Sequence, residues 1–320
     1  MIVTPALADA NNGNWQTARR WARLLRPAYR VHLTAAWSGG DEALMIALHA
    51  RRSAASVAAW RDMHAQRPLL LVLTGTDLYR DIDSDASAQR SLALADTLIV
   101  LNDLGTQRLP VELQARCHVL LQSCASRKAL SKTQRHLRAL MVGHLRDEKD
   151  PRTYFRAARR LAAHTDILLD HIGGALDPAL GEEATALAAA QPGYRWLGAL
   201  PHAVTRQHIQ RAHVLVHASR LEGGAHVVIE AVRSGTPVLA SRIAGNLGIL
   251  GMGYPGCFDV GDDAALAGWL LQARRDPAML LDLQQRLARR APLFSPAAES
   301  ATLQRLVTDG LARTASGTPR

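Results

Sequence analysis

Two carboxylates eight residues apart mark the stretch of this sequence that is richest in chemical groups. Glu222 and Glu230 flank the glycine pair 223–224, and the stretch lies between an expected strand at 214–217 and an expected helix at 226–234. Glycines let backbone N–H groups approach a ligand closely, and the first turn of a helix carries a positive partial charge. The stretch therefore predicts a loop suited to a ligand that bears phosphate.

The charge of the chain points to anionic partners. Its 38 basic and 28 acidic residues give a formal net charge of +10 over 320 residues. Nucleic acid, a membrane surface or phosphorylated small molecules fit such an excess. The basic residues are spread along expected helices such as 152–160 and 286–290, however, which is typical of solvated helix faces. Only three are lysines, so a lysine is more informative here than an arginine; they are Lys128, Lys132 and Lys149.

Short apolar runs alternate with long amphipathic stretches along the chain. This order predicts an α/β fold with parallel sheets and helices on both faces. The basic stretch 126–138 lacks a clear apolar face and is interpreted as a linker between two Rossmann-like domains that face each other across a cleft. We place the N-terminal domain at 1–125, the C-terminal domain at 139–295, and at 296–320 a helix that packs back toward the N-terminal domain, followed by a tail.

The expected elements follow from the same alternation. Strands are expected at 2–3, 31–35, 69–74, 97–101 and 118–121, then at 139–142, 167–172, 194–197, 214–217 and 237–240. Helices are expected at 15–25, 41–50, 151–163, 181–190, 204–211, 226–234 and 296–313. Ligands of such sheets bind beyond the carboxyl ends of the strands.

The cysteines and the first residues bear on the compartment. Cys117, Cys124 and Cys257 are scattered and form neither a disulfide framework nor a Cys-x-x-Cys pair, which fits a reducing compartment. The first residues lack the basic and apolar segments of a signal peptide, and no apolar run reaches about 18 residues. We therefore expect a cytoplasmic protein with no membrane partner.

The ordered motifs of the second half resemble the GT-B glycosyltransferases of the retaining, sucrose-phosphate-synthase type. Glu222 and Glu230 resemble the Glu-x7-Glu element of that family, and 142–145 with Lys149 resembles its Gly-Arg-Leu loop and diphosphate lysine. The family also has glycine-rich turns and a Pro-Val strand, and this chain has them in the same order, at 173–174, 197–198 and 237–241. The resemblance covers residues 139–290 strongly and the first half loosely, and it implies a GT-B fold.

The resemblance also implies roles for single residues. Glu222 would accept hydrogen bonds from hydroxyls of the donor sugar, Glu230 would bind ribose hydroxyls, and Lys149 would neutralise the diphosphate. His226 would contact the donor sugar or the acceptor. The expected catalytic residues are Glu222, Lys149 and His226, and the expected donor-binding residues are Gly143, Arg146, Leu197, Gly223, Gly224, Ala225 and Glu230. Taken singly, Glu230 could be a solvated helix carboxylate, and His226 could be a helix-start residue that faces a neighbour.

Three positions depart from the family pattern. His144 stands where the family has an arginine, so Arg146 would have to replace that charge. The stretch 223–225 reads Gly-Gly-Ala where relatives have Gly-Phe-Gly. The stretch 245–248 stands where many relatives carry Gly-Gly-x-x-Glu, so no third acidic contact is expected there.

The N-terminal domain is expected to hold the acceptor. An amide-rich loop follows the first strand and could expose N–H groups to an anion, and polar residues follow the strongest strand, 69–74. The expected acceptor-binding residues are Asn12, Gly13, Asn14, Thr76, Asp77 and Arg80. Instead of binding the acceptor, Asn12, Asn14 and Asp77 could cap helices. Arg80 could simply be exposed to solvent.

An acidic stretch at 81–85 contains two overlapping Asp-x-Asp triplets, which hold a metal and a nucleotide diphosphate in GT-A enzymes. It lies far along the chain from Glu222, and we interpret it as a solvated loop. We expect no bound metal and no cofactor, with a UDP-sugar as a substrate.

Features of the whole chain further resemble the selenosugar synthases of bacterial selenoneine biosynthesis. They are the stretches 4–6, 12–18, 75–79 and 222–226. The resemblance implies transfer of N-acetylglucosamine or glucose from a UDP-sugar to selenophosphate, forming a 1-selenosugar, and a functional link to other enzymes of that pathway. Three alternatives are an ordinary glycosyltransferase that builds a glycan or glycolipid, an inactive sugar-nucleotide-binding module, and a nucleic-acid binder. The last would require a patch of basic and aromatic residues that we do not find.

Overall fold

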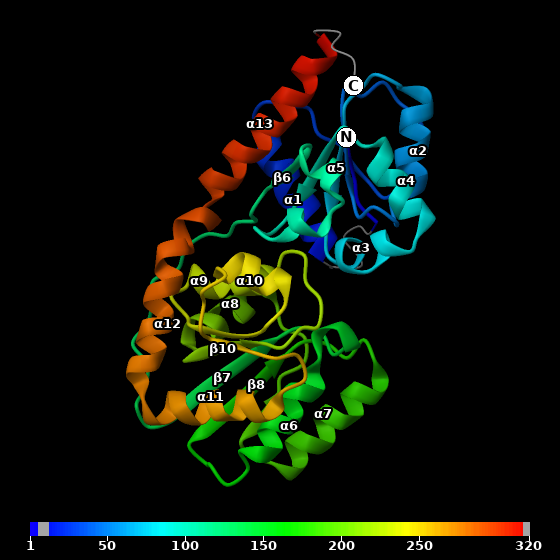
Figure 1. Ribbon diagram of the computed structural model, residues 1–320. Helices are drawn as coiled ribbons and strands as arrows, with labels where there is room; N and C mark the ends of the chain where they lie inside the picture. Colours follow the sequence, from blue (N-terminus) through cyan, green and yellow to red (C-terminus); the bar gives the residue numbers. More distant parts are fainter. Residues whose placement is uncertain (6–12, 316–320) are drawn as a thin grey trace. The chain divides into compact units, whose positions relative to one another are not determined.

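The chain folds into two compact units, each built around its own sheet (Figure 1). The structure is a computed structural model that describes residues 1–5 and 13–315. Unit 1 comprises residues 1–123, 222–224 and 296–320, and unit 2 comprises residues 124–221 and 225–295. Within the described residues each sheet has six strands, all parallel, so the expected α/β class is confirmed.

The sheet of unit 1 has the strand order β2-β1-β3-β4-β5-β6. The elements of this unit are β1 (Ile2–Val3), α1 (Gly13–Leu25), β2 (Leu33–Thr34), β3 (Met45–Leu48), α2 (Ala54–Met63), β4 (Leu69–Leu73), α3 (Thr76–Tyr79), η2 (Asp81–Asp83), α4 (Ala86–Leu94), β5 (Thr97–Val100), η3 (Gly105–Arg108), α5 (Val111–Gln114), β6 (Cys117–Val119) and α13 (Pro296–Ala315).

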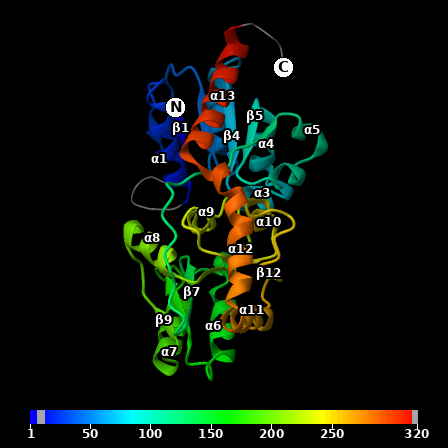
Figure 2. The same ribbon diagram turned by 90° about the vertical axis from the view of Figure 1, so that its left-hand side faces the viewer.

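Both faces of this sheet are buried, which explains the continuous apolar runs of its strands. Side chains alternate between the two faces along a strand. In β4, Leu69 and Leu71 join a core beneath α2 and α4, whereas Leu70 and Val72 join a second core beneath α1 and α13. Figure 2 shows α13 lying beside α1 in this unit. The helices therefore hold the sheet rigidly and leave the carboxyl ends of its strands to carry polar groups.

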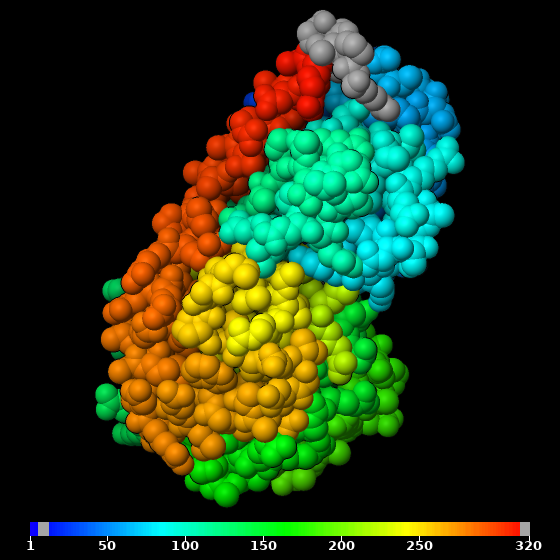
Figure 3. All heavy atoms as spheres, viewed as in Figure 1, coloured from blue at the N-terminus to red at the C-terminus, as the bar shows by residue number. Residues whose placement is uncertain are grey.

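The sheet of unit 2 has the strand order β12-β11-β10-β7-β8-β9. Helices α6, α7 and α11 lie on one face, and α8, α9 and α10 lie on the other (Figure 1). Figure 3 shows that α11 and α12, drawn in orange, form much of the visible surface of this unit. The elements are β7 (Leu137–Val142), η4 (Asp147–Lys149), α6 (Pro151–Arg160), β8 (Ile167–Ile172), α7 (Pro178–Ala190), β9 (Tyr194–Trp196), α8 (His202–Arg211), β10 (Val214–His217), α9 (His226–Val232), β11 (Val238–Ser241), α10 (Ala244–Leu250), β12 (Cys257–Phe258), α11 (Asp263–Arg275), α12 (Pro277–Arg290) and η5 (Ala291–Phe294).

One expected element is wrong, and several boundaries move. The helix expected at 41–50 is instead the buried strand β3, and helix α2 follows it. A short, fully apolar run such as Met45–Leu48 has no alternation, so periodicity alone does not separate a buried strand from a helix. Helix α1 begins at Gly13 rather than at residue 15, and β7 begins at Leu137, inside the stretch interpreted as a linker.

None of the helices that the structure describes is long and apolar enough to cross a membrane.

Candidate functional site

The sheet of unit 2 has a topological switch point between β7 and β10. The chain proceeds from β7 outward through β8 to β9, then returns to the other side of β7 to form β10. At such a point the loops after the two central strands diverge and leave a crevice at the carboxyl ends. The loop after β7 contains Gly143 and Lys149, and the loop after β10 leads to His226, so the sequence motifs lie on both sides of this point.

Gly173, at the end of β8, must be glycine because its backbone nearly touches that of Gly143, at the end of β7. A Cβ added to Gly173 would lie 1.9 Å from the carbonyl oxygen of Gly143. The aliphatic part of Lys149 lies over Gly143, since a Cβ there would be 3.5 Å from its Cγ and Cδ atoms. Leu197 follows β9, and its N–H donates to the carbonyl oxygen of His171 at 2.8 Å. The predicted residues Gly143, Lys149 and Leu197 thus lie beyond the carboxyl ends of β7 and β9, the two strands on either side of β8.

The loops after β7 and β10 are fastened to each other by Arg220. Its backbone N–H donates to the carbonyl oxygen of Glu148 at 2.9 Å, and its guanidinium lies 3.3 Å from the carboxylate of Asp150. Asp150 is buried, has a left-handed backbone (φ 45°) and also accepts from the hydroxyl of Thr153 at 2.7 Å. This residue therefore fixes the turn that presents Lys149 and begins α6.

Glu230 is a buried carboxylate surrounded by basic side chains. His202 Nε2 lies 2.5 Å from its Oε1 atom, His226 Nδ1 lies 3.5 Å away, and a nitrogen of Arg206 lies 3.8 Å away. Burial acts to raise the pKa of Glu230, but the hydrogen bonds and charges of His202 and His226 outweigh it and bring the pKa to about 2. Glu230 is therefore ionised at neutral pH, and because it is buried it is not the solvated helix carboxylate of the alternative interpretation.

His144 and Arg146 differ in what they do beside this site. His144 Nδ1 accepts from the N–H of Gly174 at 3.1 Å, which ties the loop after β7 to the loop after β8. Burial and the charge of Arg146 lower the pKa of His144, so its imidazole is neutral near pH 7. Arg146 is exposed, and its Nε atom lies 3.9 Å from Glu148. Of the two, Arg146 is the one that carries a positive charge.

The sheet of unit 1 has its own switch point, between β1 and β3, and His49 lies there. His49 directly follows β3 and has a left-handed backbone (φ 73°), which is uncommon outside glycine and typical of functional positions. Its Nε2 atom lies 2.9 Å from the hydroxyl of Thr76, and its Nδ1 atom faces Asp77 at 3.9 Å. Burial lowers the pKa of His49, although Asp77 opposes this effect.

Asp77 holds the ends of β3 and β4 in place. Its carboxylate accepts from the N–H groups of Ala50, Thr74 and Gly75, each at 2.9 Å, and it is fully buried. Its carboxylate thus accepts mainly from backbone N–H groups, and Thr76 is more accessible to solvent than Asp77. Arg80 is half-exposed and pairs with Asp81 at 3.2 Å.

Residues 222–224 group with unit 1 and leave no room for side chains on the two glycines. A Cβ on Gly223 would lie 2.3 Å from the carbonyl oxygen of Thr74, and one on Gly224 would lie 2.9 Å from the Cβ of Leu101. The buried amide of Asn102 donates to the carbonyl oxygen of Gly223 at 2.8 Å. Close packing alone therefore requires glycine at both positions.

The remaining predicted residues are distributed as follows. Gly13 and Asn14 form the first turn of α1, whereas Asn12 lies outside the described residues. Ala225 directly precedes α9 and is buried, and His226 is the first residue of that helix.

The acidic stretch at 81–85 is not a solvated loop throughout. Asp81 is buried and pairs with Arg51 at 2.9 Å, and Asp85 caps α4 by accepting from the N–H of Ala88 at 2.9 Å. Asp83 pairs with Arg108. These three carboxylates are used within unit 1. In the described part of the chain, no cluster of histidine, cysteine, aspartate or glutamate is placed to hold a metal ion.

Four residues of these sites were not expected from the sequence: His49, Asn102, His202 and Arg206. His49 and Asn102 each follow a buried strand, so their positions at strand ends were a usable signal. His202 and Arg206 lie on one face of α8, four residues apart, and only the fold places that face against Glu230.

Comparison with known proteins identifies the family and the fold. Residues 123–293 match the model of the family described as "Glycosyl transferases group 1". No curated protein matches the chain in sequence. Sucrose-phosphate synthase from Thermosynechococcus elongatus is similar in structure, with a TM-score of 0.68 and 18% identity over 84% of this chain and 74% of that one.

Two further structures were solved with UDP. HepE from Anabaena has a TM-score of 0.68 at 16% identity, covering 83% of this chain and 78% of its own. A TarM mutant from S. aureus has a TM-score of 0.67 at 13% identity, covering 84% of this chain and 55% of its own. The chain thus spans little more than half the length of TarM. These likenesses confirm the expected GT-B fold, with its two Rossmann-like units.

Proposed function

The chain belongs to the group 1 glycosyl transferases, and from this premise we propose that it moves N-acetylglucosamine or glucose from a UDP-sugar to selenophosphate. The product would be a 1-selenosugar with a new carbon–selenium bond. The observation that carries the donor half of the proposal is the switch point of unit 2, where Lys149 and the ionised Glu230 follow neighbouring strands. The acceptor half rests on the sequence resemblance and on the polar strand ends of unit 1.

We assign the UDP moiety to the crevice beside β7 and β10. The ribose hydroxyls would donate to Glu230, which is already ionised and accepts such hydrogen bonds well. Lys149 would neutralise the diphosphate, with Arg146 as a second cation. Gly143, Leu197 and Ala225 would form the backbone walls of this site. HepE and TarM, which share the fold, were both solved with UDP.

The chemical step needs a good leaving group more than a strong base. Selenophosphate is an anion near pH 7, so its selenium can attack the anomeric carbon without losing a proton. The bond from that carbon to the diphosphate oxygen breaks, and UDP leaves with the electron pair. Lys149 and Arg146 would stabilise the developing negative charge. Water then replaces selenium on phosphorus, which releases inorganic phosphate and the selenosugar.

The remaining predicted residues would act on the sugar and the acceptor. Glu222 would accept hydrogen bonds from sugar hydroxyls, and His226 would contact the sugar or the acceptor. In unit 1, the hydroxyl of Thr76, which pairs with the imidazole of His49, would donate a hydrogen bond to a small anion. Gly13 and Asn14, at the start of α1, would complete that acceptor site.

We further propose that the protein acts in the cytoplasm beside other enzymes of selenosugar metabolism. Its three cysteines are free thiols, and burial raises the pKa of Cys124 and of Cys257 to about 11 in each case. Such thiols react slowly and are compatible with a reducing compartment.

The test is UDP release by the full chain from UDP-N-acetylglucosamine and UDP-glucose with a panel of acceptors. We expect release with selenophosphate, little change on adding EDTA, and a strong loss in Glu222→Gln. A second candidate function, the building of an ordinary glycan or glycolipid, is favoured by the fold shared with the pneumococcal O-GlcNAc transferase GtfA. Release only with sugar, lipid or peptide acceptors would establish it. No release with any acceptor, despite UDP binding, would indicate a binding module.

A further inference from the structure

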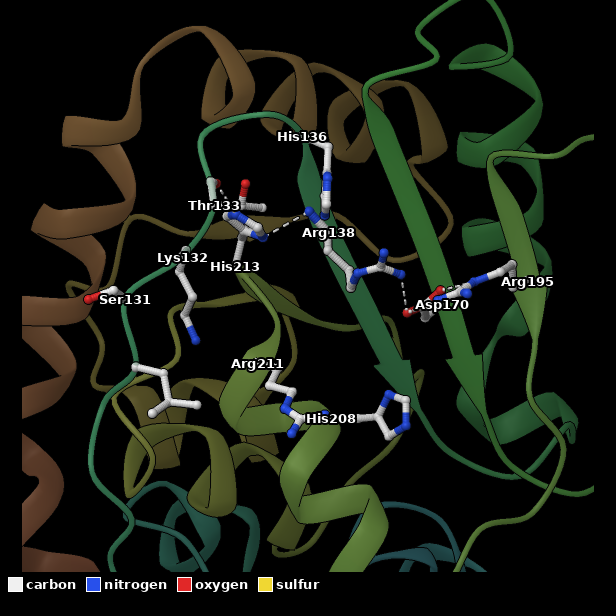
Figure 4. A pocket seen from close by; sticks show the side chains of 11 residues that line it. Ser131, Lys132, Thr133, His136, Arg138, Asp170, Arg195, His208, Arg211 and His213 are labelled. Carbon is white, nitrogen blue, oxygen red and sulfur yellow. Dashed lines mark hydrogen bonds and ion pairs between the residues drawn. The ribbon is translucent and has the colours of Figure 1, made fainter.

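Unit 2 contains a basic cavity that the proposed reaction does not use. Its volume is about 260 Å³, and Figure 4 shows the side chains that surround it. The lining comes from the extended segment before β7, from β7, β8 and β9, and from the last turns of α8. The residues are Leu130, Ser131, Lys132, Thr133, His136, Arg138, Asp170, Arg195, His208, Arg211 and His213.

The cavity lies away from the donor site within the same unit. Arg138 is the second residue of β7, and His213 directly precedes β10, so both belong to the amino ends of the central strands. Gly143 and Lys149 follow the carboxyl end of β7. Five residues of strand separate Arg138 from Gly143, which corresponds to roughly 16 Å. One ligand in the donor crevice therefore does not fill this cavity.

The charges around the cavity are unbalanced. Lys132, Arg138, Arg195 and Arg211 are cations, and Asp170 is the one carboxylate among the described residues that line it. With neutral imidazoles, three positive charges are in excess. Like charges held close together cost free energy unless an anion compensates them. Lys132 is also one of only three lysines in the chain, and its ammonium donates to the carbonyl oxygen of Gln210.

Two of the cations are held in place by one buried carboxylate. Asp170 is 1% exposed and accepts from Arg138 at 2.7 Å and from Arg195 at 2.8 and 2.9 Å. One carboxylate thus orients two guanidinium groups, in part bidentately, and Arg138 keeps further N–H donors beyond the one it gives to Asp170. Such an arrangement is pre-formed, so little side-chain entropy is lost when an anion binds.

The segment before β7, which forms one wall of the cavity, is also held in place by hydrogen bonds. His213 Nδ1 accepts from the backbone N–H of Arg138 at 3.0 Å, and its Nε2 atom lies 2.8 Å from the carbonyl oxygen of Thr133. The imidazole therefore has its proton on Nε2 and bridges the segment to the sheet. Gln210 ties the same segment to α8 by donating to the carbonyl oxygen of Lys128 at 2.6 Å.

From this juxtaposition we propose a second anion site in unit 2, formed by Lys132, Arg138 and Arg211, for a phosphate or diphosphate group. The cavity is smaller than the range of about 300–1,000 Å³ typical of pockets for drug-sized ligands, so a compact anion fits better than a whole nucleotide sugar. Arginine and lysine together favour phosphate oxygens over a lone carboxylate, because several donors converge on one group.

The experiment is a calorimetric titration of the full chain with inorganic pyrophosphate and with inorganic phosphate, at constant ionic strength and with UDP saturating. Arg211→Gln is the main variant, since Arg211 is exposed at the end of α8 and its loss leaves the core intact. Removing one charge-assisted contact is expected to weaken binding about tenfold or more. Arg289→Gln, an exposed arginine of α12, removes the same charge elsewhere in unit 2 and should leave the affinity unchanged.

The outcomes separate the second site from the donor site. The proposal is supported if pyrophosphate or phosphate binds in the presence of UDP and if Arg211→Gln weakens this binding, whereas Arg289→Gln and Lys149→Ala do not. If UDP itself does not bind, the same variants titrated without UDP still decide the question, so failure of the donor site is recognised separately. The proposal would be overturned if Arg289→Gln weakened the binding as much as Arg211→Gln, or if acetate bound as tightly as phosphate. It would also be overturned if only Lys149→Ala abolished the binding.

Discussion

Replacing Glu230 with glutamine tests the electrostatics of the donor crevice. The carboxylate is 4% exposed, and its pKa is about 2 instead of the ordinary 4.5 because the hydrogen bonds and charges of His202 and His226 outweigh the effect of burial. A shift of this size corresponds to about 3 kcal/mol of folded-state stabilisation at pH 7, at 1.36 kcal/mol per pKa unit. This is an upper bound, since His202 is 72% exposed and water screens its charge.

The sign of the pH dependence follows from the lowered pKa. The stabilisation by Glu230 is fully present above pH 4.5 and is lost as the pH falls through the folded-state value. At pH 3, about 1.4 kcal/mol of it remains. Glutamine has no such titration, so the stability difference between wild type and Glu230→Gln should shrink by about 2 kcal/mol from pH 7 to pH 3.

Urea denaturation followed by circular dichroism at the two pH values measures this difference. Calorimetry at pH 7 measures UDP binding by the same proteins, which we expect to weaken about tenfold or more when the ionised acceptor is lost. A stability difference that stays constant between pH 7 and pH 3 would refute the ion pairs around Glu230. Unchanged UDP affinity would remove this residue from the ribose site.

Three further changes test other parts of the structure. Lys149→Ala should weaken UDP binding about tenfold or more in calorimetry, while Lys128→Ala, an exposed lysine of the same unit, should have no effect. Gly173→Ala places a Cβ 1.9 Å from a carbonyl oxygen and should lower the melting temperature sharply. The control is Gly268→Ala inside α11, where an added Cβ meets no atom within 4 Å. This control should raise the free energy of unfolding by about 0.5–1 kcal/mol. Glu299→Gln removes a buried carboxylate that binds an arginine, a tryptophan and a serine of unit 1. This substitution should lower the free energy of unfolding, measured by urea denaturation, by about 3 kcal/mol or more. A decrease below about 1 kcal/mol would contradict that role.

The sequence predicted much of the fold because both sheets are parallel and buried on two faces. The run at 69–73 is continuously apolar and the strand at 167–172 is mostly so, and helices with one apolar face separate such strands. The exception is β3, whose four apolar residues are too few to distinguish a buried strand from a helix. The strand order, and with it the two switch points, depends on contacts between residues distant in sequence, which periodicity does not contain.

The candidate site could be predicted only where its residues form short motifs. The stretches 142–149 and 222–230 are such motifs, so their patterns are visible in the sequence. His202 and Arg206 reach Glu230 from another helix, and His49 meets Thr76 across 27 residues. The cavity around Asp170 was not visible in the sequence either, since its cations come from two strands, a helix and the stretch interpreted as a linker.

The most direct test of the central claim is mass spectrometry of the products formed by the full chain from a UDP-sugar and selenophosphate. We predict a selenium-containing sugar, recognised by the selenium isotope pattern, that forms only when both substrates are present and that is strongly reduced in Glu222→Gln. The account would be contradicted if UDP release were accompanied by a glycosylated acceptor that lacks selenium. It would also be contradicted if the yield of selenosugar were the same without enzyme.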